Sequence, residues 1–452
     1  ASKGGITGFD LATGKPTKVV DPSCVQSPGH HLRCYRTKAT EQFLITPFRG
    51  AEFVSLTGDD HVNNDWIRGA CTYGIMPANG LLYVPPDPCF CYPGAKLNGL
   101  LALAPAKKGK RKADDTPGLR KGPAYDDPST AGSSSTSDWP TYRHNGRRSG
   151  ATECQVSAET AEAWRLQLAG TLTPPVVAGG MLFVANKDRQ TLYAIDVATG
   201  EKRWHFTAGG RIDSPPTIHE GQVLLGCADG AVYCLRATDG ELAWRFRAAP
   251  FEERIIVHGR LESPWRVHGS VLVEDGVAYC TAGRSTYLDG GIYLFGLEPK
   301  TGEVISEAQL DTWSPRRVDA QGKPFVPAYH MEGAQSDILV AQDGFLYMGQ
   351  YQFDRQLRIQ DSPYVVPDPA NPTTAMDILD EPYVVPDADL KTGFRSFRGA
   401  HRYIENNNPE MAKEYVEKYG GMNLGDRRMG LHLSATAGFL DNSWFNRTYW
   451  FY

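Results

Sequence analysis

The fold is decided by the stretch "PPVVAGGMLFVANKDRQTLYAIDVATGEKRWHF" at residues 174–206, because the chain repeats it at residues 215–246 as "PPTIHEGQVLLGCADGAVYCLRATDGELAWRF". The two copies align almost position for position, and Trp204 and Trp244 stand forty residues apart. Within each copy, short runs of alternating apolar residues are separated by Asn, Asp and Gly, which form turns. Each copy therefore predicts four short strands.

Weaker copies of the third strand and its turn occur at residues 5–15, 50–60, 98–105 and 291–303. A four-stranded sheet that recurs at this spacing is typical of a β-propeller blade. The sequence thus predicts an all-β protein, a β-propeller of four-stranded blades, with an open solenoid as the competing architecture. We expect seven blades, with eight as the next count: a closing blade and units near residues 32–62, 71–168, 174–206, 215–246, 268–310 and 336–400.

The closing blade is expected to form from the two ends of the chain. "GITGFDL" (5–11) reads as a third strand, while "LSATAGFL" (433–440) and "SWFNRTYWFY" (443–452) read as first and second strands. If these halves pair, the ring closes without a free strand edge. A chain that lacks a further blade is the alternative.

The chain divides into five expected segments. These are N-terminal blades (1–103), a flexible low-complexity insertion (104–138), blades with the strong repeats (139–354), an insertion of loops with one helix near 408–419 (355–432), and the closing strands (433–452). The first insertion is charged and then Ser-rich, with almost no large apolar residues, a composition that does not support a packed core.

Composition excludes some classes of partner. The formal net charge of -5 provides no basic field for nucleic acid, and no apolar run is long enough to cross a bilayer. The nine cysteines form no CxxC motif, so zinc-ribbon and thioredoxin-like sites are not indicated. Free thiols and one or two disulfides both remain open; in the second case Cys89 or Cys91 would pair with Cys71 or Cys34.

The repeat resembles the pyrroloquinoline-quinone-like propeller repeat. The resemblance lies in the Pro-rich first strand, "LFVAN", "YAIDVATG" and the Trp-bearing last strand, and in the lead-in "DWPTYRHNGRRSG" (138–150). Quinoprotein alcohol dehydrogenases and the BamB-type outer-membrane assembly lipoproteins share this repeat, so the resemblance implies a periplasmic or secreted location. The dehydrogenases clamp their quinone with an adjacent Cys-Cys pair, which this chain lacks; we therefore expect no quinone cofactor.

Candidate site residues follow from the register of the repeat. The loop before the first strand and the loop between the second and third strands are expected to open on the same face, around the axis, where a rigid scaffold presents functional loops. Polar residues distant in sequence should meet there: His31, Arg33, Arg68, His268, Arg284, Tyr287, Asp289, His330, Tyr351 and His432.

A mouth lined in this way suits an anionic, hydroxylated ligand such as an acidic polysaccharide. Arginine forks bind carboxylates, and histidine with tyrosine can remove and return a proton beside a carboxylate. By analogy of fold with propeller enzymes, the prediction is a polysaccharide lyase that cleaves a uronate-containing chain by β-elimination. His268 would be the base, Tyr287 the acid, and Arg284 with Arg33 the carboxylate clamps.

Alternatives to this enzyme stay open, including the absence of any catalysis. A non-catalytic scaffold of the BamB type is the main one, and a quinone-dependent dehydrogenase is the less favoured. A propeller histidine is often a hydrogen-bonded core residue, and "YLDGG" (287–291) can be a simple turn. A divalent metal at His30 or His31 with another histidine is a further alternative, although neighbours on an extended chain point to opposite sides.

Overall fold

The computed structural model describes residues 5–22, 25, 34–47, 50–58, 60–62, 64, 66–86, 97, 99–105, 118–127, 135, 137–257, 259–311, 334–349, 351–359, 432–435, 438–440 and 450–451. Their regular structure is β-strand, with no α-helix among them, so the predicted all-β class is confirmed. Across these ranges there is accordingly no helix with the length and hydrophobicity to span a membrane. The helix expected near residues 408–419 lies outside the described residues.

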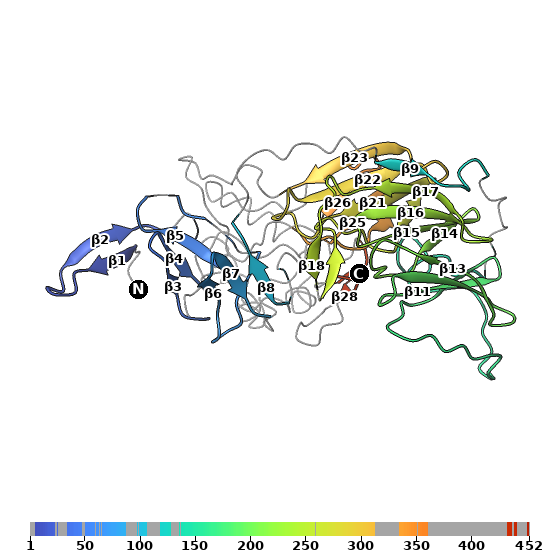
Figure 1. Ribbon diagram of the computed structural model, residues 1–452, viewed down its shortest axis with the longest axis horizontal. Coiled ribbons are helices and arrows are strands. Elements are labelled where there is room, and N and C mark those ends of the chain that lie inside the picture. The colour runs from blue at the N-terminus through green and yellow to red at the C-terminus, as the bar shows by residue number, and fades with distance from the viewer. Residues whose placement is uncertain are drawn as a thin grey trace, which may run out of the picture.

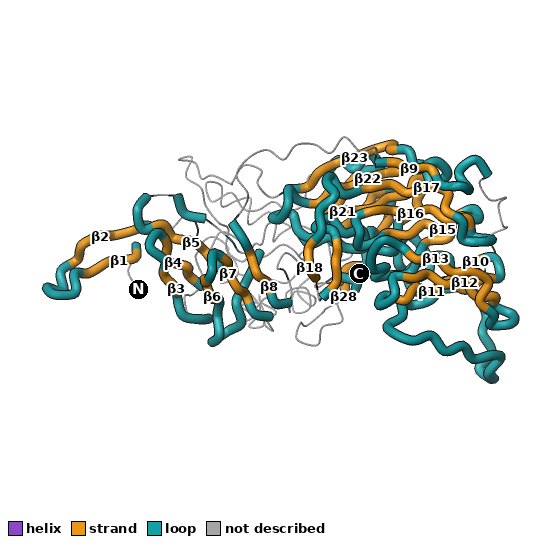
Figure 2. Tube along the Cα trace, viewed as in Figure 1, coloured by secondary structure: helices purple, strands orange, loops and turns teal. Residues whose placement is uncertain are grey.

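The strong repeats form antiparallel sheets whose strands follow one another in chain order (Figures 1 and 2). The first blade contains β10 (Val176–Ala178), β11 (Met181–Asn186), β12 (Thr191–Asp196) and β13 (Lys202–Thr207). The second contains β14 (Thr217–His219), β15 (Gln222–Gly226), β16 (Ala231–Arg236) and β17 (Leu242–Arg247). The third contains β20 (Leu272–Glu274), β21 (Val277–Ala282), β22 (Ile292–Leu297) and β23 (Val304–Leu310), and the next sheet contains β24 (Val340–Gln342), β25 (Phe345–Met348) and β26 (Tyr351–Phe353).

The "ATG" turn between the third and fourth strands has a defined chemistry. Asp196 accepts hydrogen bonds at Oδ1 from the backbone N–H groups of Ala198 and Thr199, at 2.9 and 3.0 Å. Gly200 then adopts φ 74°, a conformation that costs glycine little. Asp10 and Gly14 build the same turn between β1 (Ile6–Phe9) and β2 (Pro16–Val20). The weak repeat at residues 5–15 is therefore a third-to-fourth-strand hairpin, as predicted.

A tryptophan on the fourth strand joins each strong repeat to the next blade. Trp204 on β13 donates from Nε1 to the carbonyl oxygen of Ala237 at 3.0 Å, and Trp244 on β17 donates to that of Pro299 at 3.0 Å. Each indole lies against the glycine of the neighbouring turn, Gly240 or Gly302, where a β-carbon would overlap the ring. The forty-residue spacing of the tryptophans thus reflects blade-to-blade contact.

The N-terminal strands form smaller sheets on the opposite side of the molecule from the strong repeats (Figure 1). The hairpin β1–β2 is followed by a sheet of β3 (Lys38–Ala39), β4 (Phe43–Thr46) and β5 (Glu52–Ser55), and by one of β6 (Met76–Ala78), β7 (Leu81–Val84) and β8 (Leu101–Leu103). Each of the last two has the first three strands of a blade, in chain order.

The expected pairing of the two chain ends is not seen among the described strands. β1 and β2 pair with each other, and β27 (Ser434–Ala435) pairs with β28 (Trp450–Phe451) in a separate sheet. In Figure 1 the β1–β2 hairpin lies at one end of the molecule and β28 lies near its middle, too far apart for a shared ladder. Ring closure and the count of seven blades stay predictions.

Part of the segment expected to be flexible forms a strand. β9 (Leu119–Lys121) pairs antiparallel with β17 and extends the second blade to five strands. Leu119 packs against the core cluster that contains Trp244, and Asp127 makes an ion pair with Arg236 at 2.7 Å. The prediction of an unstructured insertion over 104–138 is therefore wrong for residues 118–127, because this short apolar-basic run finds an open strand edge.

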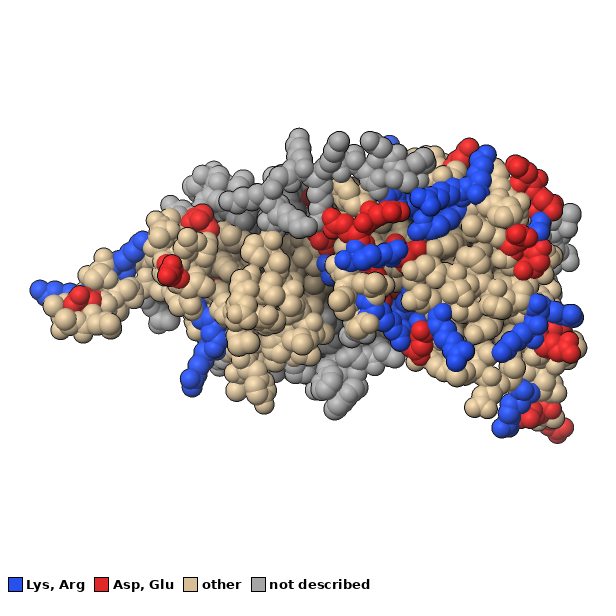
Figure 3. All heavy atoms as spheres, viewed as in Figure 1, with Lys and Arg blue, Asp and Glu red and all other residues tan. Residues whose placement is uncertain are grey.

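A hairpin between the second and third blades carries charged contacts. It consists of β18 (Ile255–Val257) and β19 (Arg260–Glu262). Glu262 binds Arg211 through two hydrogen bonds of 2.7 and 3.1 Å, and Arg260 also contacts Asp188 of the first blade. Across the face drawn in Figure 3, basic and acidic side chains of the described residues are intermixed over the blades.

Candidate functional site

The repeat register brings together one residue from each of three successive blades. Asp213, His268 and Ser336 each lie four residues before a first strand, β14, β20 and β24 respectively. The first strands of neighbouring blades contact one another, so residues in this position meet near the axis. Residues at equivalent positions of three blades therefore lie together, while the predicted functional role of His268 stays a prediction.

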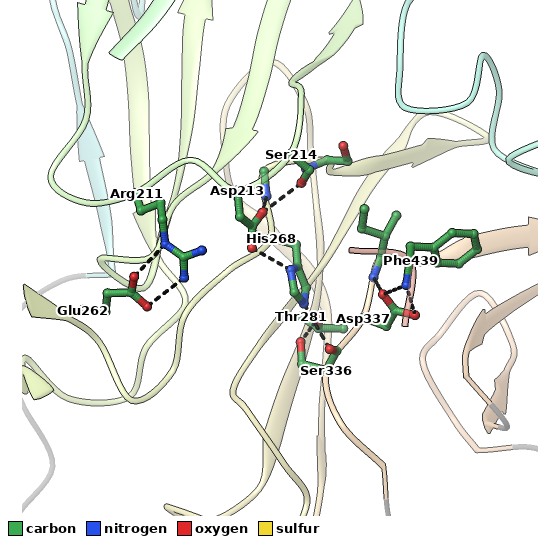
Figure 4. Close-up of polar contacts among 12 residues, drawn as sticks. Arg211, Asp213, Ser214, Glu262, His268, Thr281, Ser336, Asp337 and Phe439 are labelled. Carbon is green, nitrogen blue, oxygen red and sulfur yellow. Dashed lines mark hydrogen bonds and ion pairs between the residues drawn. The ribbon is translucent and has the colours of Figure 1, made fainter. Parts of the chain in front are cut away.

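His268 is held between two hydrogen-bond acceptors (Figure 4). Its Nδ1 lies 2.9 Å from Oδ2 of Asp213, and its Nε2 lies 3.1 Å from the carbonyl oxygen of Ser336. The His268 and Asp213 side chains are each only 7% exposed. Neither acceptor can donate, so both ring nitrogens must carry hydrogen for the two bonds to form. His268 thus links three blades through its two ring nitrogens.

Both carboxylate oxygens of Asp213 accept hydrogen bonds. Its Oδ1 accepts from the hydroxyl of Ser214 and from the backbone N–H of Gly269, each at 2.9 Å. Burial alone would raise the pKa of Asp213, but the charge of His268 and these hydrogen bonds hold that pKa well below its usual range. Asp213 therefore stays ionised and provides the counter-charge for His268.

A second buried carboxyl holds the C-terminal segment to the blades. Oδ1 of Asp337 accepts from the backbone N–H groups of Ile338 and Phe439, at 2.8 and 3.0 Å. Burial raises the pKa of Asp337 to about 6, although the nearby charge of His268 acts in the opposite direction. Asp337 therefore changes charge near neutral pH while it anchors residues 438–440.

The raised pKa of Asp337 predicts a pH dependence of stability. Its usual value is 3.8, so the folded protein binds this proton more tightly than the unfolded chain. The resulting stability is present at low pH and is lost as pH rises through about 6. Relative to Asp337→Asn, the wild-type free energy of unfolding should rise by about 1–1.5 kcal/mol between about pH 7.5 and about pH 5, measured by urea denaturation.

The control for this prediction is Asp343→Asn, because Asp343 is largely exposed in a turn. The difference in the free energy of unfolding between Asp343→Asn and wild type should be the same at both pH values. A wild-type protein whose stability relative to Asp337→Asn stays constant or falls on acidification would contradict the assigned direction.

The lead-in segment 139–150 lies across the first strands. Its backbone hydrogen-bonds to three blades, through the pairs Trp139–Val177, Pro140–Ile218 and Gly146–Ala341. Arg148 is fully buried, and its Nε donates to the carbonyl oxygen of Leu339 at 3.0 Å. Burial lowers the pKa of Arg148 to about 10. The lead-in therefore connects the first strands of three blades through its backbone.

The expected mouth residues of the third blade lie near one another but are engaged locally. Arg284 makes an ion pair with Asp289 at 2.6 Å in the loop between β21 and β22. Tyr287, in the same loop, stacks on Trp66 with ring centroids 6.1 Å apart. This stacking joins the loop to the core cluster of the N-terminal strands. The proposed acid Tyr287 therefore faces Trp66, whereas the proposed base His268 faces Asp213 and Ser336.

The other predicted residues lie in separate places. Arg68 is buried and donates from Nη2 to Sγ of Cys34 at 2.6 Å. Nε2 of His432 contacts the carbonyl oxygen of Gly349 at 2.9 Å, and its ring stacks on Tyr347. Tyr351 begins β26. The remaining predictions, His31, Arg33 and His330, lie outside the described residues.

Two further sequence predictions concern metals and cysteines. No cluster of three or more metal-ligating side chains occurs within the described ranges; His30 and His31 fall outside them. Cys34 carries a free thiol, which excludes the disulfide that one alternative gave it. Cys89 and Cys91 are also beyond the residues that the structure covers.

Sequence reasoning missed Asp213, Ser336, Asp337 and Arg148. A signal for the first two was present: they occupy the register position of His268 in the neighbouring repeats. Arg148 belongs to the lead-in, which precedes the repeats, so the register does not place it.

Comparison with known proteins agrees with this architecture. Residues 152–341 match the family model described as "Outer membrane protein assembly factor BamB". The segment is 30% identical over 87 residues to BamB of Nitrosomonas eutropha, covering 19% of this chain and 21% of that one. It is 28% identical over 104 residues to BamB of Burkholderia pseudomallei, covering 22% and 27%. The matched region thus spans about a fifth to a quarter of these curated relatives.

Two solved structures align with part of the chain. BamB of Moraxella catarrhalis aligns with a TM-score of 0.28 and 16% identity, over 44% of this chain and 63% of that one. Quinohemoprotein alcohol dehydrogenase of Comamonas testosteroni aligns with a TM-score of 0.32 and 21% identity, over 38% and 27%. TM-scores this low carry no argument.

The blades and their axial contacts define a protein of the β-propeller class. Within that class, the matched segment makes it a PQQ-like, BamB-like repeat protein.

Proposed function

We propose that this protein is a non-catalytic scaffold of the BamB-like kind, which acts outside the cytoplasm in the assembly of outer-membrane proteins. The curated relatives are named for that role. The single observation that carries the proposal is the position of His268, the proposed base of the competing lyase mechanism. It is buried, and both of its ring nitrogens face acceptors, so it has no free lone pair with which to take a proton from a substrate.

The surroundings of His268 support the same conclusion. A propeller enzyme that uses its axial face needs an opening that admits a chain of sugars. Here the lead-in hydrogen-bonds to the first strands of three blades, and Arg148 is fully buried beside Leu339. Asp213, His268 and Ser336 contact one another where the chain enters three of the first strands (Figure 4). A protein that works by presenting its outer surface to partners has no need of an open axis.

Two experiments test the function. The first expresses the coding sequence in cells, and the second uses the purified protein. In the first, the protein is expressed outside the cytoplasm of a Gram-negative strain that lacks its own BamB, and folded outer-membrane proteins are quantified by heat-modifiable electrophoresis. We expect the amount of folded outer-membrane proteins to rise at least twofold, in the direction of the parent strain. Unchanged levels with the protein present at normal abundance would count against the assembly role.

The second arm tests the lyase hypothesis, in which an acidic polysaccharide is the ligand. The protein is incubated with pectate, alginate and glycosaminoglycans, and the ultraviolet absorbance of the unsaturated product is followed. We expect no rate above the blank. Product formation that is lost in Tyr287→Phe would favour the lyase hypothesis over the scaffold. Arg284 and Asp289 would then be the groups near the substrate.

A further inference from the structure

The contact that the blade tryptophans make with the next blade is also made by Trp164, which lies outside the described strands. Trp164 donates from Nε1 to the carbonyl oxygen of Val197 at 2.8 Å, and its indole lies against Gly200. Trp204 and Trp244 make the same two contacts with the next turns along the chain. Trp164 also precedes Trp204 by the same forty residues. It therefore occupies the place of a fourth-strand tryptophan, docked on the first blade.

The residues around Trp164 have the exposure pattern of a fourth strand. Trp164, Leu166 and Leu168 are half-buried, and the residues between them are exposed. β13 shows the same alternation from Trp204 to Thr207. Yet none of the strand pairings or bridges in the described residues includes residues 161–168. The segment therefore has the exposure pattern of a strand without the ladder of one.

The sheet β6–β8 shows the complementary gap. Its strands correspond to the first three strands of a blade, and β8 is its outer strand within the part that the structure describes. Leu100, just before β8, is 72% exposed. In the first two complete blades, the outer edge of the third strand pairs with the tryptophan strand. An unpaired third strand is an open row of hydrogen-bonding groups that a fourth strand can satisfy.

The register between these two edges follows from the first blade. Ala78 pairs with Leu81 as Ala178 pairs with Met181, so the two hairpins are equivalent. Leu82 then pairs with Leu103, as Leu182 pairs with Ile195. This equivalence makes Ala102 the counterpart of Ala194, the residue that lies opposite Trp204. Ala102 should therefore lie opposite Trp164, and Leu101 opposite Arg165.

We infer that residues 161–168 are the fourth strand of the β6–β8 sheet and that this pairing seats the N-terminal sheets beside the first blade. The segment that occupies the β8 edge belongs to the same chain, because residues 104–160 connect β8 to residues 161–168. Trp164 already contacts the first blade at Val197 and Gly200. In Figure 1 the β6–β8 sheet and the blade β10–β13 lie apart, so the pairing brings them together. It makes one continuous row of blades from β3 to β26.

A photo-crosslinking experiment tests this pairing directly. Benzoylphenylalanine replaces Leu101 in the full chain, the protein is irradiated, and the crosslinked peptides are mapped by mass spectrometry. We expect the main product to join position 101 to residues 163–167. The matched control places the same group at Tyr193, whose observed partner is His205 on β13, and it calibrates the yield for a paired strand.

Mixing isotope-labelled and unlabelled protein identifies which copy supplies the partner strand. Products within one chain, at a yield similar to that of the control, support the inference. Products between labelled and unlabelled chains would replace it by strand exchange between two copies. Products elsewhere, or a yield less than a tenth of the control, would overturn it. The inference does not rest on the assembly role, since the crosslink is read without any partner or activity.

Discussion

Replacing His268 by alanine is expected to destabilise the protein by roughly 3–5 kcal/mol, because it leaves the buried charge of Asp213 without its partner. Three blades lose a common contact at once, since the ring bonds to Asp213 and Ser336 from its own blade. The measurement is urea denaturation of the protein, with the tryptophan fluorescence of the second and third blades as the readout. His205→Ala is the control, because His205 lies exposed on β13, and its change should be below about 0.5 kcal/mol.

A double-mutant cycle separates the ion pair from the loss of packing. Asp213→Asn combined with His268→Ala removes the uncompensated charge, so the double variant should be less destabilised than the sum of the two single variants by more than about 1 kcal/mol. Additive effects within about 0.5 kcal/mol would show that His268 and Asp213 do not act as a unit.

The second large effect is expected at Trp244, where Trp244→Ala should cost roughly 3–5 kcal/mol. The indole is fully buried in the core cluster between the second and third blades. Its Nε1 also bonds to Pro299 in the neighbouring turn. Removal of the ring leaves a cavity at the junction between blades, which the surrounding strands can close only in part. Urea denaturation again measures the loss.

The control for Trp244 is a conservative variant. Trp244→Phe retains much of the apolar volume and loses the hydrogen bond, so it should cost about half as much or less. If alanine and phenylalanine destabilise the protein equally, then the hydrogen bond to Pro299 dominates and packing between blades does not.

The strong repeats made the blades predictable from sequence. Their turns, at Asp196 and Gly200 and at Asp239 and Gly240, require specific residues, so local chemistry marks the hairpins. The register also identified His268 as a residue that precedes a first strand, as Asp213 and Ser336 do. Pairings between distant segments were not predictable in the same way. β9 joins β17 because that edge is open and Leu119 fits beside Trp244, which no local pattern announces.

The chemical role of the axial residues was harder to predict than their position. A histidine, a tyrosine and arginines in loops of one face are compatible with catalysis and with structure, and the sequence led to a prediction of catalysis. The difference lies in the partners. His268 meets two acceptors and Tyr287 meets Trp66, and such partners depend on the packing of several blades. Nor does any single repeat contain the lead-in that fills the axis.

The central claim is that His268 donates a hydrogen bond from each ring nitrogen and so links three blades, and nitrogen NMR of the protein labelled with ¹⁵N-histidine tests it most directly. The His268 signals are assigned by their loss in His268→Gln. The account predicts that both ring nitrogens carry hydrogen at neutral pH, with shifts of an imidazolium. A neutral ring, with one nitrogen unprotonated and free to accept a proton, would contradict the account and restore His268 as a candidate base.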